Sequence, residues 1–210
     1  MSGVAKRALD FAIAVFGLIV LFPLLLLIAL AIRWRMGSPV LFRQRRPGYN
    51  ARPFAMIKFR TMIVGDTAAT SHSDAERLTP LGASLRRYSL DELPQFWNVL
   101  KDEMSLVGPR PLLMEYLERY TPEQARRHDV KPGITGWAQV QGRQDIPFSR
   151  RLELDVWYVD HQGFWLDLKI LWLTLLKILG GAGVRSGQDV RLVDDLGLHP
   201  ATRKGEGGHD

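Results

Sequence analysis

The feature that most constrains this sequence is an uncharged apolar run from Phe11 to Ile32, FAIAVFGLIVLFPLLLLIALAI. As an α-helix the run would extend about 33 Å, which is the thickness of a bilayer core. A cleaved signal peptide is a poor interpretation, because the run is too long and is followed by Arg33-Trp34-Arg35 rather than by a small-residue cleavage site. The run is more typical of a membrane segment than of a buried core helix.

Basic residues flank this run on both sides. Lys6 and Arg7 precede it, and a larger group of arginines follows it: Arg33, Arg35, Arg43, Arg45 and Arg46. Basic flanks favour the cytoplasmic side of a membrane, so both ends are candidates for that side. Because the larger excess follows the run, the globular part of the chain is expected in the cytoplasm.

Pro23 lies near the middle of the run, where it removes a backbone donor and biases Phe22 away from helical angles. A membrane hinge at Phe22-Pro23 would return the chain to the face it entered. The alternative is a kinked helix that spans the bilayer, since proline is tolerated in such helices. The residues alone leave both topologies open.

Composition narrows the class of protein. The 210 residues suit one domain with or without appendages, and a chain that is 46% hydrophobic and 24% charged is not disordered. The net charge of +6 favours anionic partners, including phosphates, nucleotides, nucleic acid or an acidic membrane face. The absence of cysteine excludes disulfides and thiolate metal sites, and the scattered histidines argue against a zinc site.

The rest of the chain predicts a mainly α fold with a small β element, of the α+β class. Short strands are expected at 40–42 and 54–64, around a turn at Pro47-Gly48-Tyr49-Asn50. Loops or irregular stretches are expected at 65–80, 107–111 and 131–143. Helices are expected at 81–88, 94–100, 112–127 with a break at Pro122, and 149–159.

The segment 164–179 is very apolar but carries Asp167, Lys169 and Lys177, so it is too short and too charged to span a bilayer. One helical stripe collects most of its large apolar side chains: Trp165, Leu168, Trp172, Leu175, Leu176 and Leu179. Such a helix suits the membrane interface, and equally the core of the domain. Beyond it, residues 181–210 predict a partly disordered tail.

Two adjacent carboxylates, Asp91 and Glu92, stand in the stretch SLDELPQFWNVL at 89–100. Ser89 and Glu92 fit a capping box at a helix start, whereas Pro94 as the first helical residue would leave both acids just outside the helix. An aspartate can also act as a covalent nucleophile, and Mg²⁺ prefers one or two carboxylates plus substrate phosphates. Spacing alone favours capping over catalysis.

Two arginines in rigid backbone settings favour a catalytic role for the acid pair over a capping role. Arg110 lies between two prolines, and Arg143 follows a glycine-rich turn. Planar guanidinium groups match phosphate oxygens. Each arginine alone is most simply a surface residue. Together with the acid pair and the membrane segment, they indicate phosphoryl transfer at a membrane surface.

On these residues the chain resembles the small monotopic phosphoglycosyl transferases of bacteria. The resemblance runs from about residue 5 to about residue 180. It rests on five stretches in the family's order: FRQRRPG (42–48), KFRTM (58–62), SLDELPQFWNVL (89–100), MSLVGPRP (104–111) and KPGITGWAQVQGR (131–143). It implies a re-entrant membrane helix at 1–36, a compact catalytic core with interfacial amphipathic helices at 37–180, and a tail at 181–210.

The resemblance also implies the reaction. Such enzymes transfer a sugar 1-phosphate from a UDP-sugar to undecaprenyl phosphate and release UMP, working among membrane lipids on the cytoplasmic face of the bacterial inner membrane. Asp91 matches the nucleophile and Glu92 the Mg²⁺ ligand. The matched phosphate-binding positions are Lys58, Arg60, Arg110 and Arg143, and the possible supporting acids are Asp155 and Asp167. Relatives often carry Ser-Pro where this chain has Phe22-Pro23, which departs from the family's hinge.

A competing function from another class is a membrane-tethered basic module that binds or scaffolds anionic ligands. A nucleic-acid partner is not expected, because the arginines sit in turns rather than along one stripe and no recognition motif is present. The two classes differ in a testable way, since a binding module keeps its function when Asp91 becomes asparagine.

Overall fold

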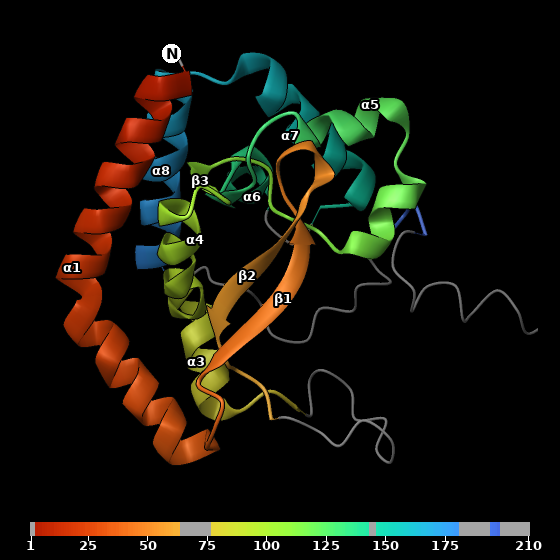
Figure 1. The fold of residues 1–210 in the computed structure, drawn as a ribbon. Coiled ribbons are helices and arrows are strands. Elements are labelled where there is room, and N and C mark those ends of the chain that lie inside the picture. The colour runs from red at the N-terminus through yellow and green to blue at the C-terminus, as the bar shows by residue number, and fades with distance from the viewer. Residues whose placement is uncertain (1–2, 64–76, 143–145, 181–193, 198–210) are drawn as a thin grey trace, which may run out of the picture.

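The computed structural model describes residues 3–63, 77–142, 146–180 and 194–197. Within these residues the fold is mostly helical, with two small two-stranded sheets, as expected for the mainly α class (Figure 1). The long helix α1 runs along one side of the molecule, and α8 lies behind its N-terminal half in this view.

Helix α1 spans Gly3–Met36 and continues through Pro23. It bends near its middle in Figure 1, so the proline bends the helix and does not break it, and Phe22 stays helical. By length and composition it is the one helix in the described residues that could cross a membrane. Many of its large apolar side chains have no protein cover; Phe16, Phe22 and Leu27 are 68%, 62% and 65% exposed.

Polar contacts fasten the N-terminal part of α1 to the globular body. The buried Asp10 carboxylate accepts hydrogen bonds from Ser105 Oγ at 2.7 Å and from the Leu106 amide at 3.2 Å. Arg7 donates to the carbonyls of Val99 and Leu100 at 2.6 and 3.0 Å. This end of the helix is therefore docked by specific bonds as well as by packing.

The C-terminal part of α1 docks on the same body. Ile28 and Ile32 pack against Phe59 and Leu85 in one buried cluster. The buried Arg60 guanidinium donates to the carbonyls of Met36, Gly37 and Ser38, with distances of 2.9 Å to Gly37 and 3.0 Å to Ser38. The Met36 carbonyl is one that the helix end leaves without an intrahelical partner, and the other two belong to the residues that follow the helix. Both ends of the apolar helix therefore contact one globular domain.

A β-hairpin follows. Strands β1 (Leu41–Pro47) and β2 (Pro53–Phe59) pair antiparallel, with Leu41 opposite Phe59 and Pro47 opposite Pro53. The 3₁₀ turn η1 (Tyr49–Ala51) joins them. The predicted turn and the presence of two strands are confirmed, but β1 is longer than the expected 40–42 and β2 ends at Phe59 rather than at residue 64. On β2, Phe54 and Met56 lie on one face and are buried in the main core, whereas Phe59 lies on the other face and is buried against the C-terminal part of α1.

The middle of the chain builds a short parallel sheet. Its strands are β3 (Ser105–Val107) and β4 (Gly133–Thr135), and α6 (Trp137–Gln141) follows directly. The sequence predicts only an irregular stretch at 131–143, and the strand β4 and the helix α6 show that this prediction was wrong. A Cβ on Gly133 would lie 2.1 Å from the Gly108 amide nitrogen, and one on Gly136 2.2 Å from the Gly108 carbonyl oxygen. These glycines let the two backbones approach.

The remaining predicted helices are present. Their bounds are α3 Pro80–Arg87, η2 Leu90–Gln95, α4 Phe96–Leu100, η3 Met114–Arg119, α5 Pro122–Ala125, η4 Arg126–His128, α7 Phe148–His161 and α8 Phe164–Leu179. The break expected at Pro122 is confirmed, because this proline begins α5 and Thr121 forms a capping box with Gln124. The loop expected at 65–80 lies largely outside the described residues, as does most of the tail.

Helix α8 has two distinct faces. Ile170 is fully buried in the main core, and the Asp167 carboxylate is buried on the same helix. The six residues of the predicted stripe are all exposed, with Trp165 at 77% and Leu179 at 73%. Within the described residues, the helix therefore packs on the core through one face and leaves its most apolar stripe exposed.

Candidate active site

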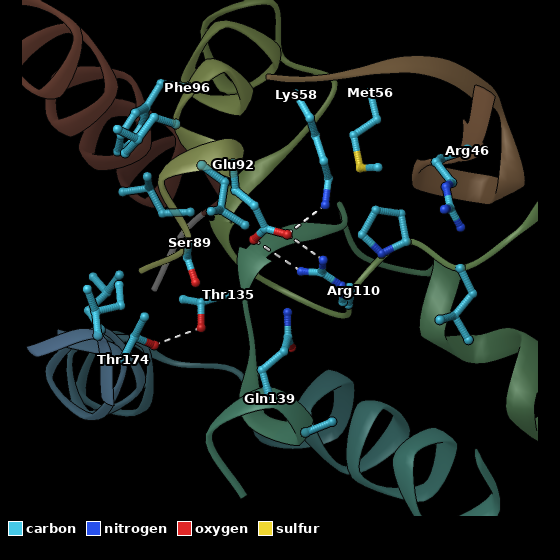
Figure 2. Close-up of a pocket in the computed structure, with 18 of the residues that line it drawn as sticks. Arg46, Met56, Lys58, Ser89, Glu92, Phe96, Arg110, Thr135, Gln139 and Thr174 are labelled. Carbon is cyan, nitrogen blue, oxygen red and sulfur yellow. Dashed lines mark hydrogen bonds and ion pairs between the residues drawn. The ribbon is translucent and has the colours of Figure 1, made fainter. Parts of the chain in front are cut away.

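A cavity of about 370 Å³ opens among the hairpin, η2, the loop after β3, and helices α6, α7 and α8 (Figure 2). Its polar lining comes from Arg46, Lys58, Ser89, Glu92, Arg110, Thr135, Gln139, Arg151, Asp155 and Thr174. Its apolar lining includes Met56, Leu93, Phe96, Leu106, Ile134, Leu171 and Ile178. One cavity thus joins a charged wall to an apolar wall that includes the core side of α8.

The two acids enter this region on the 3₁₀ helix η2. Ser89 precedes it in the left-handed region, with φ 55° and ψ 23°, and its side chain makes no capping hydrogen bond. Pro94 lies inside η2, and α4 begins only at Phe96. The capping-box interpretation of Ser89 and Glu92 is therefore wrong, and so is Pro94 as the first helical residue. A non-glycine residue with positive φ is uncommon and costs energy.

Glu92 is clamped by two cations (Figure 2). Its Oε1 accepts from Lys58 Nζ at 2.6 Å and from Arg110 Nη2, and its Oε2 accepts from Arg110 Nη1 at 3.2 Å. Burial alone would raise the pKa of Glu92, but the charges of Arg110 and Lys58 outweigh it and hold this pKa well below its usual range. Glu92 is therefore a permanent anion that orients Lys58 and Arg110.

In the part of the chain that the structure describes, Asp91 is not paired with a cation, in contrast to Glu92. Its side chain is buried, and within the described residues its carboxylate forms no hydrogen bond or salt bridge. Burial, and then repulsion from Glu92, raises the pKa of Asp91, and the charges of Lys58, Arg110 and Arg86 offset this only in part. A carboxylate that is poorly solvated and not engaged by cations is a more reactive nucleophile than one in a salt bridge.

Of the other predicted site residues, some line the cavity and others lie elsewhere. Asp155 lines the cavity and is held by Arg127 at 2.7 Å, with both side chains buried. Asp167 lies outside the cavity lining; it accepts from Lys6 at 2.6 Å and from the Tyr158 hydroxyl at 2.7 Å. Arg60 caps the end of α1, away from Glu92. Arg143 is outside the described residues.

Several cavity residues were missed from the sequence. Arg46 belongs to the basic flank and to the stretch FRQRRPG, and Thr135 and Gln139 to the stretch KPGITGWAQVQGR, but no pattern in the sequence assigns these residues, or Arg151 and Thr174, to the site. The hydroxyls of Thr135 and Thr174 are 2.7 Å apart, and Thr174 also donates to the Ile170 carbonyl at 2.8 Å. The signal for Thr135 and Gln139 lay in their position within the glycine-rich stretch at 131–143, but no local rule points such side chains into a cavity.

The acid pair offers carboxylate oxygens, which are the type of ligand that Mg²⁺ binds. No group of three His, Cys, Asp or Glu side chains in the described chain could hold a metal, but Mg²⁺ takes only one or two carboxylates when substrate phosphates supply the rest. A carboxylate has about four lone-pair positions. Lys58 and Arg110 occupy three on Glu92, which leaves one on Oε2 for a metal.

Comparison with known proteins identifies the family. Residues 1–181 match the model of the bacterial sugar transferase family, so the chain belongs to that family. This confirms the resemblance drawn from the motifs and the expectation of a phosphoglycosyl transferase.

Individual relatives agree. An uncharacterized sugar transferase, EpsL of Bacillus subtilis, is 50% identical over 89% of this chain and 93% of its own length. A UDP-glucose:undecaprenyl-phosphate glucose-1-phosphate transferase of Xanthomonas campestris is 44% identical over 84% of this chain but only 39% of its own length. The exopolysaccharide production protein ExoY of Sinorhizobium fredii is 35% identical over 83% of this chain and 85% of its own length.

Proposed function

We propose that this chain transfers a sugar 1-phosphate from a UDP-sugar to undecaprenyl phosphate, with release of UMP, through a covalent intermediate on Asp91. The observation that carries the proposal is the contrast within the acid pair. Glu92 lines the cavity and is paired with Lys58 and Arg110, whereas its neighbour Asp91 is buried, is not among the lining residues, and forms no hydrogen bond or salt bridge within the described residues. The charges of Lys58 and Arg110 nevertheless act on Asp91. Relatives whose names state this reaction, with UDP-glucose as the donor, support it.

In the first step an Asp91 carboxylate oxygen attacks the phosphorus that carries the sugar. The bond from that phosphorus to the bridging oxygen breaks, and the nucleoside monophosphate leaves with the electron pair. In the second step a phosphate oxygen of the lipid attacks the same phosphorus, and the carboxylate is released. No oxidant or reductant is needed, and each step exchanges one P–O bond for another.

The cations near Glu92 suit this chemistry. Lys58 and Arg110 lie beside the cavity in fixed orientations, so they can receive phosphate oxygens without reorganising during the reaction. Mg²⁺ bound through Glu92 Oε2 would supply charge neutralisation between an anionic nucleophile and an anionic phosphate. The apolar wall of the cavity provides a water-poor setting, in which these interactions are stronger than in bulk water.

We further propose that α1 is re-entrant and that the catalytic body lies on the cytoplasmic face of the membrane. A spanning helix would separate its two ends by a bilayer, yet Asp10 at one end and Ile32 at the other contact the same domain. The exposed apolar side chains of α1 and the exposed stripe of α8 support contact with lipid. Basic flanks favour the cytoplasmic side.

The test of the reaction is a donor-only experiment. Wild-type protein in nanodiscs, incubated with Mg²⁺ and a panel of UDP-sugars, should gain the mass of a sugar phosphate and release UMP. Asp91→Asn should do neither, because an amide lacks the charge to attack phosphorus. Asp160→Asn is the matched control, since Asp160 is an exposed acid that pairs with Arg126. Normal turnover by Asp91→Asn contradicts the proposed nucleophile.

A further inference from the structure

Two arginines of the cavity lack an acidic partner. Arg46, from β1, donates to the Gln44 side-chain oxygen at 2.7 Å, and Arg151, from α7, reaches the Ile146 carbonyl at 3.4 Å and lies 4.7 Å from the Phe148 ring centre. In the described part of the chain neither forms a salt bridge with a carboxylate, and the Nε of each is buried without a hydrogen-bond partner. Both are therefore cations held in the cavity wall at a cost.

The electrostatic surroundings confirm that cost. Burial, and then the charge of Arg110, lowers the pKa of Arg46 to about 10. Burial also lowers the pKa of Arg151, although Asp155 acts in the opposite direction. The two other arginines of this region are compensated, because Arg110 is bonded to Glu92 and Arg127 to Asp155. Among the described residues, the fold therefore pairs Arg110 and Arg127 with carboxylates but leaves Arg46 and Arg151 without one.

The charge balance of the cavity points to an anion. Its lining holds four cationic side chains, Arg46, Lys58, Arg110 and Arg151, against two carboxylates, Glu92 and Asp155. Asp155 is already engaged by Arg127, and Glu92 by both Lys58 and Arg110, so Arg46 and Arg151 are the lining cations that have no carboxylate partner among the described residues. Gln139 adds an amide whose nitrogen and oxygen are both buried without partners, and it points toward Arg110 (Figure 2).

The shared cavity suggests which anion this is. Arg46 and Arg151 line the same cavity as Lys58 and Arg110, and the charge of Arg110 acts on Arg46. A donor diphosphate carries a second phosphate one bridging oxygen away from the phosphorus that Asp91 would attack. Arg46 and Arg151 are therefore available for a phosphate other than the one at Lys58 and Arg110.

We propose that Arg46 and Arg151 form a subsite for a phosphate monoester, separate from the clamp of Lys58 and Arg110 around Glu92. The inference rests on the proposed function, in which two molecules carry this group: the departing nucleoside monophosphate and the acceptor lipid phosphate. Guanidinium groups bind such a group through paired hydrogen bonds that a lysine does not reproduce.

The experiment measures binding directly. The Kd of UMP is determined by calorimetry, and the Kd of undecaprenyl phosphate by titration into nanodiscs, for wild type, Arg46→Gln, Arg151→Gln and the double variant. Each substitution should weaken binding about tenfold to hundredfold, as expected for loss of a hydrogen bond to a charged group. Arg45→Gln and Arg150→Gln are matched controls, because each is the exposed sequence neighbour of a cavity arginine.

The two arms identify the source of the phosphate. Weaker UMP binding assigns the subsite to the nucleotide, and weaker lipid phosphate binding assigns it to the acceptor; loss in either arm supports the proposal. Unchanged Kd values for both molecules in the double variant overturn it, as does a wild type that binds neither. Failure of the proposed function has a different signature, namely no mass adduct and no UMP release by wild type with any UDP-sugar.

A stability measurement separates binding from a structural role. Arg46→Met and Arg151→Met replace a half-buried charge that has no carboxylate partner in the described residues by an apolar chain, so they should raise the Tm of the ligand-free protein. They should also reduce the rise in Tm that a fixed concentration of UMP or lipid phosphate produces in wild type, because that rise depends on Kd. Arg→Lys variants serve if a glutamine variant does not fold. A lower Tm in both methionine variants, with an undiminished ligand-induced rise, contradicts the subsite.

Discussion

Asp91 and Glu92 are neighbours in the chain, but their surroundings act on them in opposite directions. Two cations hold Glu92 ionised, whereas burial and the charge of Glu92 disfavour the ionised form of Asp91. Pairs of acids whose pKa values are pushed apart in this way are typical of sites where each acid has its own chemical role. At the residue scale, this difference generates two predictions.

The first concerns Asp91 and pH. Because the folded-state pKa of Asp91 lies above its ordinary value of 3.8, ionisation destabilises the fold as pH rises above that value. Asp91→Asn removes this cost, so it should stabilise the protein by about 0.5–2 kcal/mol at neutral pH, with a smaller gain near pH 4. Thermal unfolding in nanodiscs across pH 4–8 measures the difference. A destabilised Asp91→Asn protein at neutral pH would contradict the raised pKa.

The second concerns Glu92 and metal. Glu92→Gln keeps the shape but leaves Lys58 and Arg110 without a countercharge, which should cost about 3 kcal/mol or more of stability. Turnover should be lost in wild type after EDTA treatment and restored by Mg²⁺, and the variant should need more Mg²⁺ for half-maximal rate. Glu118→Gln is the control, because Glu118 is exposed. Full wild-type activity after exhaustive EDTA treatment would rule out the metal.

At the scale of elements, the docking of α1 depends on a few side chains from distant parts of the chain. Arg60 is the clearest case, since it was expected near substrate phosphate and instead bonds carbonyls at the end of α1. The residue type and its place in the motif KFRTM are equally compatible with both roles. Only the folded chain shows which acceptors are within reach.

We therefore predict that Arg60→Ala acts mainly on stability. Loss of its hydrogen bonds should lower the free energy of unfolding by about 2 kcal/mol, while the KM for the UDP-sugar changes little. Arg43→Ala on β1 is the control, since Arg43 is exposed. A large rise in KM at unchanged Tm would instead support the phosphate-binding role that the resemblance implied.

Local patterns predicted the elements far better than they predicted the cavity. The hairpin, the break at Pro122 and the outward stripe of α8 all follow from turn residues and periodicity. Strand β4 and helix α6 were missed because three glycines hide short regular structure that forms only when two backbones meet. The Glu92 clamp joins residues 34 positions apart, and the burial of Arg46 depends on the whole fold, so neither has a local signature.

At the scale of the whole molecule, the catalytic body and both ends of α1 form one unit. We predict that single cysteines at Ser2 and Ser38 of this cysteine-free chain face the same side of the membrane. A membrane-impermeant thiol reagent should leave both unlabelled in intact cells and label both in inverted vesicles. Labelling of the Ser2 position from outside the cell would show that α1 spans the bilayer.

The docking of α1 at both ends also determines how the protein responds to bilayer thickness. A free membrane helix adapts to a thicker or thinner bilayer by tilting. Here Arg7 and Asp10 hold one end and Arg60 the other, so the tilt of α1 is set by the protein. If α1 is re-entrant, as we propose, its depth is fixed relative to the globular body, and a bilayer of different thickness must deform around it. The lipids would then adjust to the protein, and the cavity would stay at a constant height above the membrane core.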